Sequence, residues 1–340
     1  MIKNRNIHTL MRPLALIIGL ALTATPALAG SLSDKLDNLQ LSGFVDTSYS
    51  GTNAKGPTAA STGFGLDQVE LDIVYKKDNI GLRFDLNGFP SAGTATTGDT
   101  LFEQGYITYT IPNIADDGVT FTFGKFNAPI GWELLDAPDM YQFSHALVFS
   151  NGIPTNLTGA SLAAKIGMVD GVVYYSNKVD VNGISTTGVR SAGGRLGITP
   201  IKGANIGISY LNTTNPGLTS DKTIDIDFTY DAIDHLVIGG EYNQTKTSIT
   251  RTGGVFATVH YDFTEMFGAT YRFGTWDGDQ HKPGKLTANT FAVTSVLGDG
   301  LGALAEYRTV NNTSKTIMGS ENFASNFKTH AYAFEMTYAF

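Results

Sequence analysis

The most constraining feature of this sequence is an alternation of apolar and polar residues, with a period of two, in short segments separated by turn residues. Segment 80–87 shows it strictly, with one set made of Ile80, Leu82, Phe84 and Leu86 and the other of Gly81, Arg83, Asp85 and Asn87. Successive side chains of a β-strand point to opposite faces, so this pattern predicts a strand with one apolar and one charged face. Comparable alternation recurs at 41–50, 69–75, 224–230, 255–263, 267–273, 303–308 and 332–340.

Weaker alternating segments raise the expected total to about sixteen strands, within a range of roughly 14 to 18, and bacterial membrane barrels have even strand numbers. Short connections, among them Lys76–Asn79, Asp170-Gly171 and Asp299-Gly300, alternate with longer ones rich in Gly, Ser, Thr and Asn. Short turns at one rim and long loops at the other are typical of a barrel. We therefore expect an all-β fold, a transmembrane antiparallel β-barrel over residues 41–340.

A soluble β-sandwich would also alternate, but two features favour a membrane barrel. Aromatic residues that lie near strand ends on the apolar face suit the membrane–water boundary, and they include Tyr49, Tyr109, Phe126, Tyr242, Phe263 and Phe273. The opposite face carries ionisable residues within the strands, namely Glu70, Arg83, Asp85, Arg195, Asp227, Glu241, Arg272, Glu306, Arg308 and Glu335. A water-filled lumen accepts such charges, whereas a dry sandwich core does not; a solvated sandwich face would accept them as well.

The N-terminal residues have the pattern of a secretory signal peptide. Lys3, Arg5 and Arg12 precede a short apolar run, and Ala27-Leu28-Ala29 is a small-residue cleavage site. We expect removal of 1–29, which changes the net charge from −8 to −11, and a short periplasmic segment at 30–40. The acidic balance argues against nucleic acid as a partner. The absence of cysteine excludes disulfides and thiolate chemistry.

The last segment sets Tyr332, Phe334, Met336, Tyr338 and Phe340 on one face. A strand of this kind ending in Phe340 resembles the C-terminal signal by which the barrel-assembly machinery recognises outer-membrane proteins. The resemblance implies location in the bacterial outer membrane, in contact with lipid and lipopolysaccharide.

The most specific stretch is GKFNAPIGWELLDAPDMYQFSHALVFSNGIPTNLTGA, residues 124–160. It resembles the signature of the OmpL-like β-barrel porin-2 family, a family of Gram-negative outer-membrane porins. The matching positions are Gly124, Lys125, Pro129, Gly131, Glu133, Asp136, Pro138, Tyr141, Ser144, Pro154, Thr158 and Gly159. A weaker resemblance extends over residues 41–340, and it implies a porin.

The connection 127–157 within this stretch is long and unusually apolar, and connections of that length without a strand pattern are usually functional. We expect it to fold inward as the third loop of the barrel, with an extracellular cap packed on itself as the alternative. An inward loop would place Glu133, Asp136 and Asp139 as the acidic side of a pore constriction. The lumen-facing residues Arg83, Arg195, Arg272 and Arg308 could supply a basic side.

No catalytic, metal or cofactor site is expected. Ser144 and His145 are adjacent on an extended chain, so their side chains point apart and cannot form a nucleophile–base pair. His260, His281 and His330 lack the spacing of metal ligands, and the acidic loop around Gly278 lacks the remaining ligands of a calcium loop.

These expectations converge on an outer-membrane porin for passive diffusion of small hydrophilic solutes, with a mild preference for cations. Analogy with general porins of this size suggests a homotrimer. The alternative is a non-conducting surface or structural barrel that binds a partner through its long loops, and a barrel enzyme is the third hypothesis.

Overall fold

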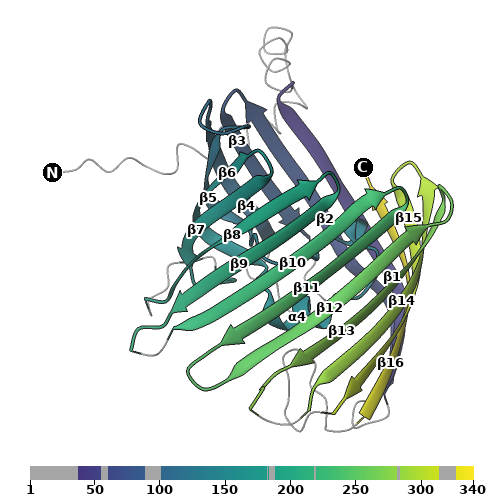
Figure 1. Cartoon of the computed structure of the whole chain (residues 1–340). Coiled ribbons are helices and arrows are strands. Elements are labelled where there is room, and N and C mark those ends of the chain that lie inside the picture. Colours follow the sequence, from purple (N-terminus) through teal and green to yellow (C-terminus); the bar gives the residue numbers. More distant parts are fainter. Residues whose placement is uncertain are drawn as a thin grey trace.

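The computed structural model contains a single closed antiparallel barrel (Figure 1). It describes residues 37–54, 60–88, 101–181, 183, 188–217, 220–281, 284–313 and 327–340. Each strand pairs with its neighbours in sequence, and β1 closes the sheet by pairing with β16. The predicted all-β barrel of about sixteen strands is thereby confirmed. The predicted signal peptide 1–29 and most of the segment 30–40 lie outside the described residues.

The strands are β1 (Leu39–Ala54), β2 (Ser61–Lys77), β3 (Ile80–Asn87), β4 (Phe102–Ile111), β5 (Val119–Asn127), β6 (Asn156–Ile166), β7 (Val169–Asn177), β8 (Arg190–Ile201), β9 (Ala204–Thr214), β10 (Asp221–Ile233), β11 (Leu236–Lys246), β12 (Arg251–Asp262), β13 (Phe267–Asp277), β14 (Leu286–Gly298), β15 (Leu301–Asn312) and β16 (Phe327–Ala339). Two short helical segments, η2 (Ala137–Asp139) and α4 (Leu147–Gly152), lie between β5 and β6. No helix in the described ranges is long and apolar enough to cross a membrane.

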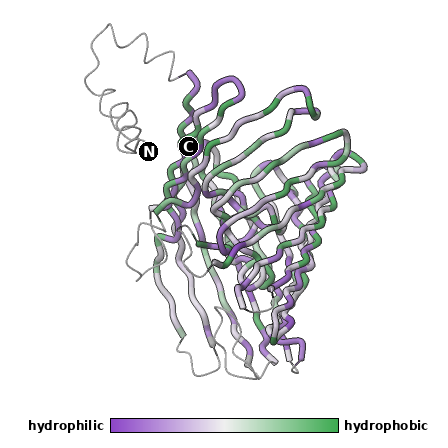
Figure 2. The backbone as a smooth tube through the Cα atoms, turned by 90° about the vertical axis from the view of Figure 1, so that its left-hand side faces the viewer, coloured by the Kyte–Doolittle hydropathy of each residue, from purple (hydrophilic) through white to green (hydrophobic). Residues whose placement is uncertain are grey.

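The two faces of the sheet differ as the alternation predicts. On β10, Ile224, Ile226 and Phe228 are exposed on the outside of the barrel. Asp225 and Asp227 point inward between them and are buried. Figure 2 shows the same alternation of hydrophobic and hydrophilic residues along many strands. An outer apolar surface with an inner polar one is the arrangement that lipid outside and water inside require.

Most connections after the even-numbered strands are two-residue turns, although residues 112–118 follow β4, and most of those after the odd-numbered strands are longer. Because neighbouring strands run in opposite directions, the short turns share one rim and the long loops the other. The predicted turn at Asp170-Gly171 is wrong. Ile166 pairs directly with Val169, so the turn closes at Gly167 and Met168, and Asp170 becomes an inward residue of β7.

Two further details differ from the sequence expectation. The barrel begins at Leu39 rather than at Leu41, because Leu39 already pairs with Tyr75 of β2. Phe126, expected among the outer aromatic residues, points inward and is buried against the third loop. The other aromatic residues named above, including Tyr109 and Phe263, are exposed on the outer surface.

Candidate functional site: the third loop inside the barrel

Residues 128–155, here called the third loop, connect β5 to β6 and fold into the barrel, which confirms the expected inward loop. Helix α4 contacts β11, β12 and β13, while η2 contacts β1 and β16. These strands belong to different sectors of the wall, so the loop extends across the lumen rather than lying against one side. In Figure 1, α4 is seen behind β11–β13, on their inner side.

An apolar cluster holds the α4 end of the loop against the wall. Leu147 and Val148 are essentially inaccessible to solvent and pack among inward side chains of β12 to β15, namely Phe256, Trp276, Leu286, Ala288 and Val310. Burial of two aliphatic side chains contributes several kcal/mol, at about 1.5–3 kcal/mol each. Apolar residues on an inner wall are unsuited to a water-filled lumen, and the loop removes them from water.

Trp132 extends this cluster. Its ring lies 5.8 Å from that of Phe256, edge to face, and its indole Nε1–H donates to Thr229 Oγ1 at 2.8 Å. The ring packs on Gly239, where a Cβ atom would lie 2.2 Å from the indole. The indole therefore buries its apolar body while its N–H keeps a hydrogen-bond partner.

A second apolar cluster lies where the loop leaves and rejoins the sheet. It contains Phe126, Ile130, Leu157, Tyr174 and Leu211, with Leu157 fully buried. The family-motif residues surround this point. Gly124 and Gly159 face each other across β5 and β6, and a Cβ on either would lie within 2.3 Å of a backbone carbonyl oxygen. Lys125 Nζ donates to the Phe102 carbonyl at 2.7 Å. The motif residues thus form the points where the third loop leaves β5 and joins β6.

The ion pair between Glu133 of the loop and Arg272 of β13 anchors the loop to a strand that α4 also contacts. Both side chains are almost fully buried. Glu133 also accepts from the Ala146 N–H at 2.7 Å, and His145 Nδ1 lies 3.4 Å away. Burial by itself would raise the pKa of Glu133, but Arg272 and His145 outweigh it and hold that pKa below its usual range. Glu133 is therefore a buried, compensated carboxylate.

Backbone groups of the loop are satisfied by side chains of the inner wall. The Trp132 N–H donates to Glu241 at 2.7 Å, the Ser144 N–H to Glu306 at 3.1 Å, and the Ala137 N–H to Gln68 at 3.2 Å. Arg272 donates to the Ser144 carbonyl at 2.5 Å. Strands on both sides of the lumen thus supply partners that an inward loop needs.

The three loop acids occupy different environments. Glu133 is paired, Asp139 is exposed, and Asp136 is half-buried near Glu103 of β4. Burial, Glu103 and Asp139 together raise the pKa of Asp136 to about 7. The acidic character predicted for the loop is therefore concentrated at η2.

The four arginines do not form one basic side opposite the acids. Arg83 Nε lies 2.7 Å from Asp85, and Arg195 lies 2.6 Å from Asp227 and 3.2 Å from Asp170. Arg272 pairs with Glu133. Arg308 of β15 lies two strands from Arg272 at the same level of the wall, because Thr290 of β14 is opposite both arginines in the strand register. They lie on β3, β8, β13 and β15, so they are spread around the circumference and interleave with carboxylates.

Sequence reasoning missed Glu103. Strict alternation would place it on the lipid face, because Gln104 points into the lumen. The pairing of β3 with β4 shifts register here, with Asp85 opposite Gln104 and Leu86 opposite Phe102, so Glu103 is the extra residue of a β-bulge. A bulge re-aims a side chain, and Glu103 meets Glu70 and Asp136 inside the barrel.

Comparison with known proteins agrees with this architecture. The sequence profile of the family described as "Putative beta-barrel porin-2, OmpL-like" matches residues 38–340. No curated protein sequence matches the chain. Among solved structures, the anion-selective porin from Comamonas acidovorans is similar with a TM-score of 0.68 and 14% identity, over 89% of this chain and 99% of that one.

Two further structures share the fold. OmpF of Salmonella typhi, in a complex with daunomycin, has a TM-score of 0.65 at 12% identity, over 89% of this chain and 97% of that one. The outer-membrane channel DcaP of Acinetobacter baumannii has a TM-score of 0.63 at 11% identity, with the same coverage of 89% and 97%. At these identities the likeness shows the fold alone.

Proposed function

Because the chain belongs to the putative β-barrel porin-2, OmpL-like family and folds as a porin-like outer-membrane channel, we propose that it allows passive diffusion of small hydrophilic solutes. The observation that carries the proposal is the third loop across the lumen, which would narrow a polar passage through the barrel. Family and fold indicate a channel rather than an enzyme.

The charges of the inner wall support a mild preference for cations. The buried carboxylates Asp46, Glu70, Asp85, Asp225, Asp227, Glu241, Glu306 and Glu335 outnumber the inward arginines of the described residues, Arg83, Arg195, Arg272 and Arg308. A passage lined by carboxylates concentrates cations and repels anions. The exposed Asp139 adds a further negative charge beside the passage.

Planar-bilayer recording of the refolded protein tests both parts of the proposal. We expect single-channel steps and, under a salt gradient, a reversal potential that indicates modest cation preference. A strong anion preference would contradict the charge argument. Complete absence of steps from protein that folds and shows normal heat-modifiability would reject the channel itself.

A second candidate is a non-conducting surface or structural barrel that binds a partner through its long loops. The two apolar clusters favour it, because the third loop buries Leu147, Val148 and Leu157 so completely that it fills part of the lumen. The bilayer recording separates the two candidates, since a barrel closed by its loop gives no steps. Removal of residues 132–150 would then open it.

The proposal includes the cellular context. The signal peptide 1–29 would direct export, and the assembly machinery would recognise the strand ending in Phe340, which is 60% exposed on the outer side. The exposed outer surface would contact outer-membrane lipid and lipopolysaccharide. A homotrimer is supported by the trimer form reported for OmpT of Vibrio cholerae, which shares the fold at 12% identity and a TM-score of 0.62.

A further inference from the structure

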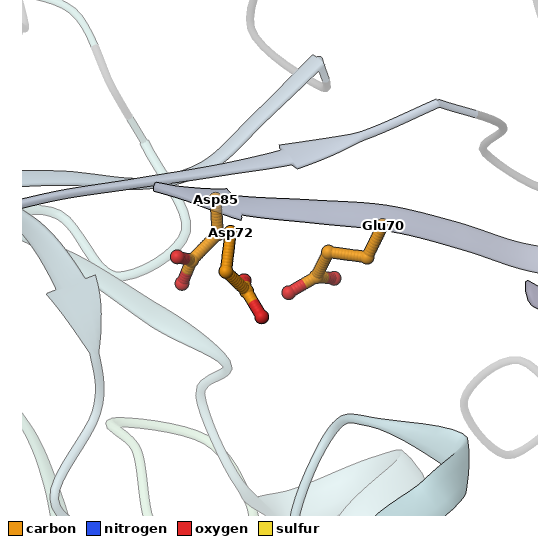
Figure 3. Close-up of side chains that lie close together, drawn as sticks. All are labelled: Glu70, Asp72 and Asp85. Carbon is orange, nitrogen blue, oxygen red and sulfur yellow. The ribbon is translucent and has the colours of Figure 1, made fainter. Parts of the chain in front are cut away.

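A cluster of carboxylates lies on the inner wall beside η2, away from the Glu133–Arg272 pair. Glu70 and Asp72 of β2 and Asp85 of β3 bring carboxylate oxygens within 4.8 Å of one another. Figure 3 shows how these three side chains gather on the wall. Carboxylate oxygens of Glu70, Glu103 and Asp136 also lie within 4.8 Å of one another, and these residues form a second group. Glu70 belongs to both groups, so its carboxylate lies at the centre of the cluster.

The environment of the Glu70 carboxylate points to a ligand. The side chain is only 2% exposed, and neither carboxylate oxygen has a hydrogen-bond donor among the described residues. Figure 3 shows it turned toward Asp72, another acid. A buried carboxylate without a donor or counter-charge is strongly disfavoured, so it needs a proton or a cation.

Neighbouring donors satisfy one half of the cluster only. Asp85 accepts from Arg83 and from Gln104, and Arg83 also lies 3.7 Å from Asp72. On the other half, Glu103 Oε1 and Asp136 Oδ1 are buried and lack a hydrogen-bond partner in the described part of the chain. Asp72 Oδ1 also lacks a hydrogen-bond partner there, but Arg83 lies close enough to offset its charge, so the cluster's oxygens in need of a partner come from Glu70, Glu103 and Asp136.

We propose that Glu70, Glu103 and Asp136 bind a calcium ion, which ties the third loop to β2 and β4. Carboxylate oxygens are hard ligands of the kind that Ca²⁺ prefers, at 2.3–2.6 Å. Oxygens on opposite sides of the ion are then about 5 Å apart, so a group within 4.8 Å can bind Ca²⁺ with little movement. Mg²⁺, with ligands at about 2.1 Å, requires a tighter and more regular set.

This site departs from the sequence expectation of no metal. The three ligands come from β2, from a bulge in β4 and from a loop, so no local spacing signals them. The inference depends on the inward fold of the loop and not on conduction, so it can fail or hold independently of the proposed channel.

Calorimetric titration of CaCl₂ into the refolded chain tests the site, in zwitterionic detergent free of lipopolysaccharide and after treatment with a chelator. We expect one saturable site, with Mg²⁺ binding at least tenfold more weakly. Glu70→Gln should weaken Ca²⁺ binding at least tenfold. Glu335→Gln is the matched control and should bind as the wild type does, because Glu335 is an equally buried glutamate of the inner wall outside both groups.

Asp136→Asn keeps the test decisive if Glu70→Gln does not fold, because Asp136 lies in the loop and not in the sheet. It should also weaken Ca²⁺ binding at least tenfold, and Ca²⁺ should slow proteolysis of the third loop in the wild type but not in this variant. Absence of saturable Ca²⁺ binding by folded wild type would overturn the proposal. Equal affinities of wild type, Glu70→Gln and Asp136→Asn would also overturn it, as would tighter binding of Mg²⁺ than of Ca²⁺.

Discussion

The third loop has two ends across the lumen, one at α4 and one at η2, and they contact the barrel wall through different chemistry. At β11–β13 the contact is largely apolar, and the acid that the loop contributes there, Glu133, is paired with Arg272. At β2–β4 the contact is acidic, and buried carboxylate oxygens of Glu70, Glu103 and Asp136 lack a hydrogen-bond donor among the described residues. One end is thus held by partners within the chain, whereas the other has buried carboxylates to which we propose that a calcium ion binds.

The largest effect should come from breaking the buried ion pair. Arg272→Met leaves Glu133 charged and uncompensated, which costs about 4 kcal/mol of loop docking. Both tryptophans of the chain, Trp132 and Trp276, lie at this end, so their fluorescence during a urea titration reports loop release. The double variant Arg272→Met/Glu133→Gln removes the uncompensated charge and should recover most of the lost free energy of loop docking. Equal urea midpoints of loop release for Arg272→Met and wild type would show that the Glu133–Arg272 ion pair does not hold the loop.

Next in size is the apolar contact at the same end. Leu147→Ala removes a side chain that is 1% exposed and should destabilise loop docking by about 3 kcal/mol, measured by the same fluorescence titration. Leu134→Ala is the matched control, because Leu134 lies in the same loop but is 55% exposed. Its effect should stay within about 0.5 kcal/mol. Similar losses for both variants would argue against specific packing of α4.

A smaller effect should follow the pH. The pKa of Glu133 in the folded state lies below its ordinary value of 4.5, so its stabilising contribution is fully present above pH 4.5. The contribution is lost as the pH falls through the folded pKa, by at most about 1.4 kcal/mol per pH unit. Loop release should therefore become easier in acid. The Glu133→Gln/Arg272→Met variant should lose this part of the pH dependence, and an unchanged acid response would assign it to other groups.

The smallest effect concerns the exposed acid of η2. Asp139→Asn should reduce the cation preference slightly, as a shift of the reversal potential, while docking stability changes by less than about 0.5 kcal/mol. Asp139 is exposed, so its charge acts on passing ions and not on packing. A change of docking stability as large as that of Leu147→Ala would mean that Asp139 is structural.

The alternation of residues sufficed to predict the barrel, because a period of two records which face each side chain takes. The length and apolar content of residues 127–157 predicted the inward loop, since residues such as Leu147 and Val148 could not remain in water. Alternation failed at Glu103, where a bulge changes the face, and the Asp170-Gly171 turn signal failed because pairing of Ile166 with Val169 moves the turn. The pairing of Glu133 with Arg272, remote in sequence, depends on how the loop crosses the lumen, and no local pattern encodes that.

We propose that the third loop crosses and narrows a conducting lumen. The decisive measurement is the single-channel conductance of the wild type compared with that of a variant that lacks residues 132–150. We predict small, regular steps for the wild type and clearly larger steps for the deletion, with both proteins folded by heat-modifiability. Equal conductance of the two folded proteins, or no conductance in either, would contradict the claim.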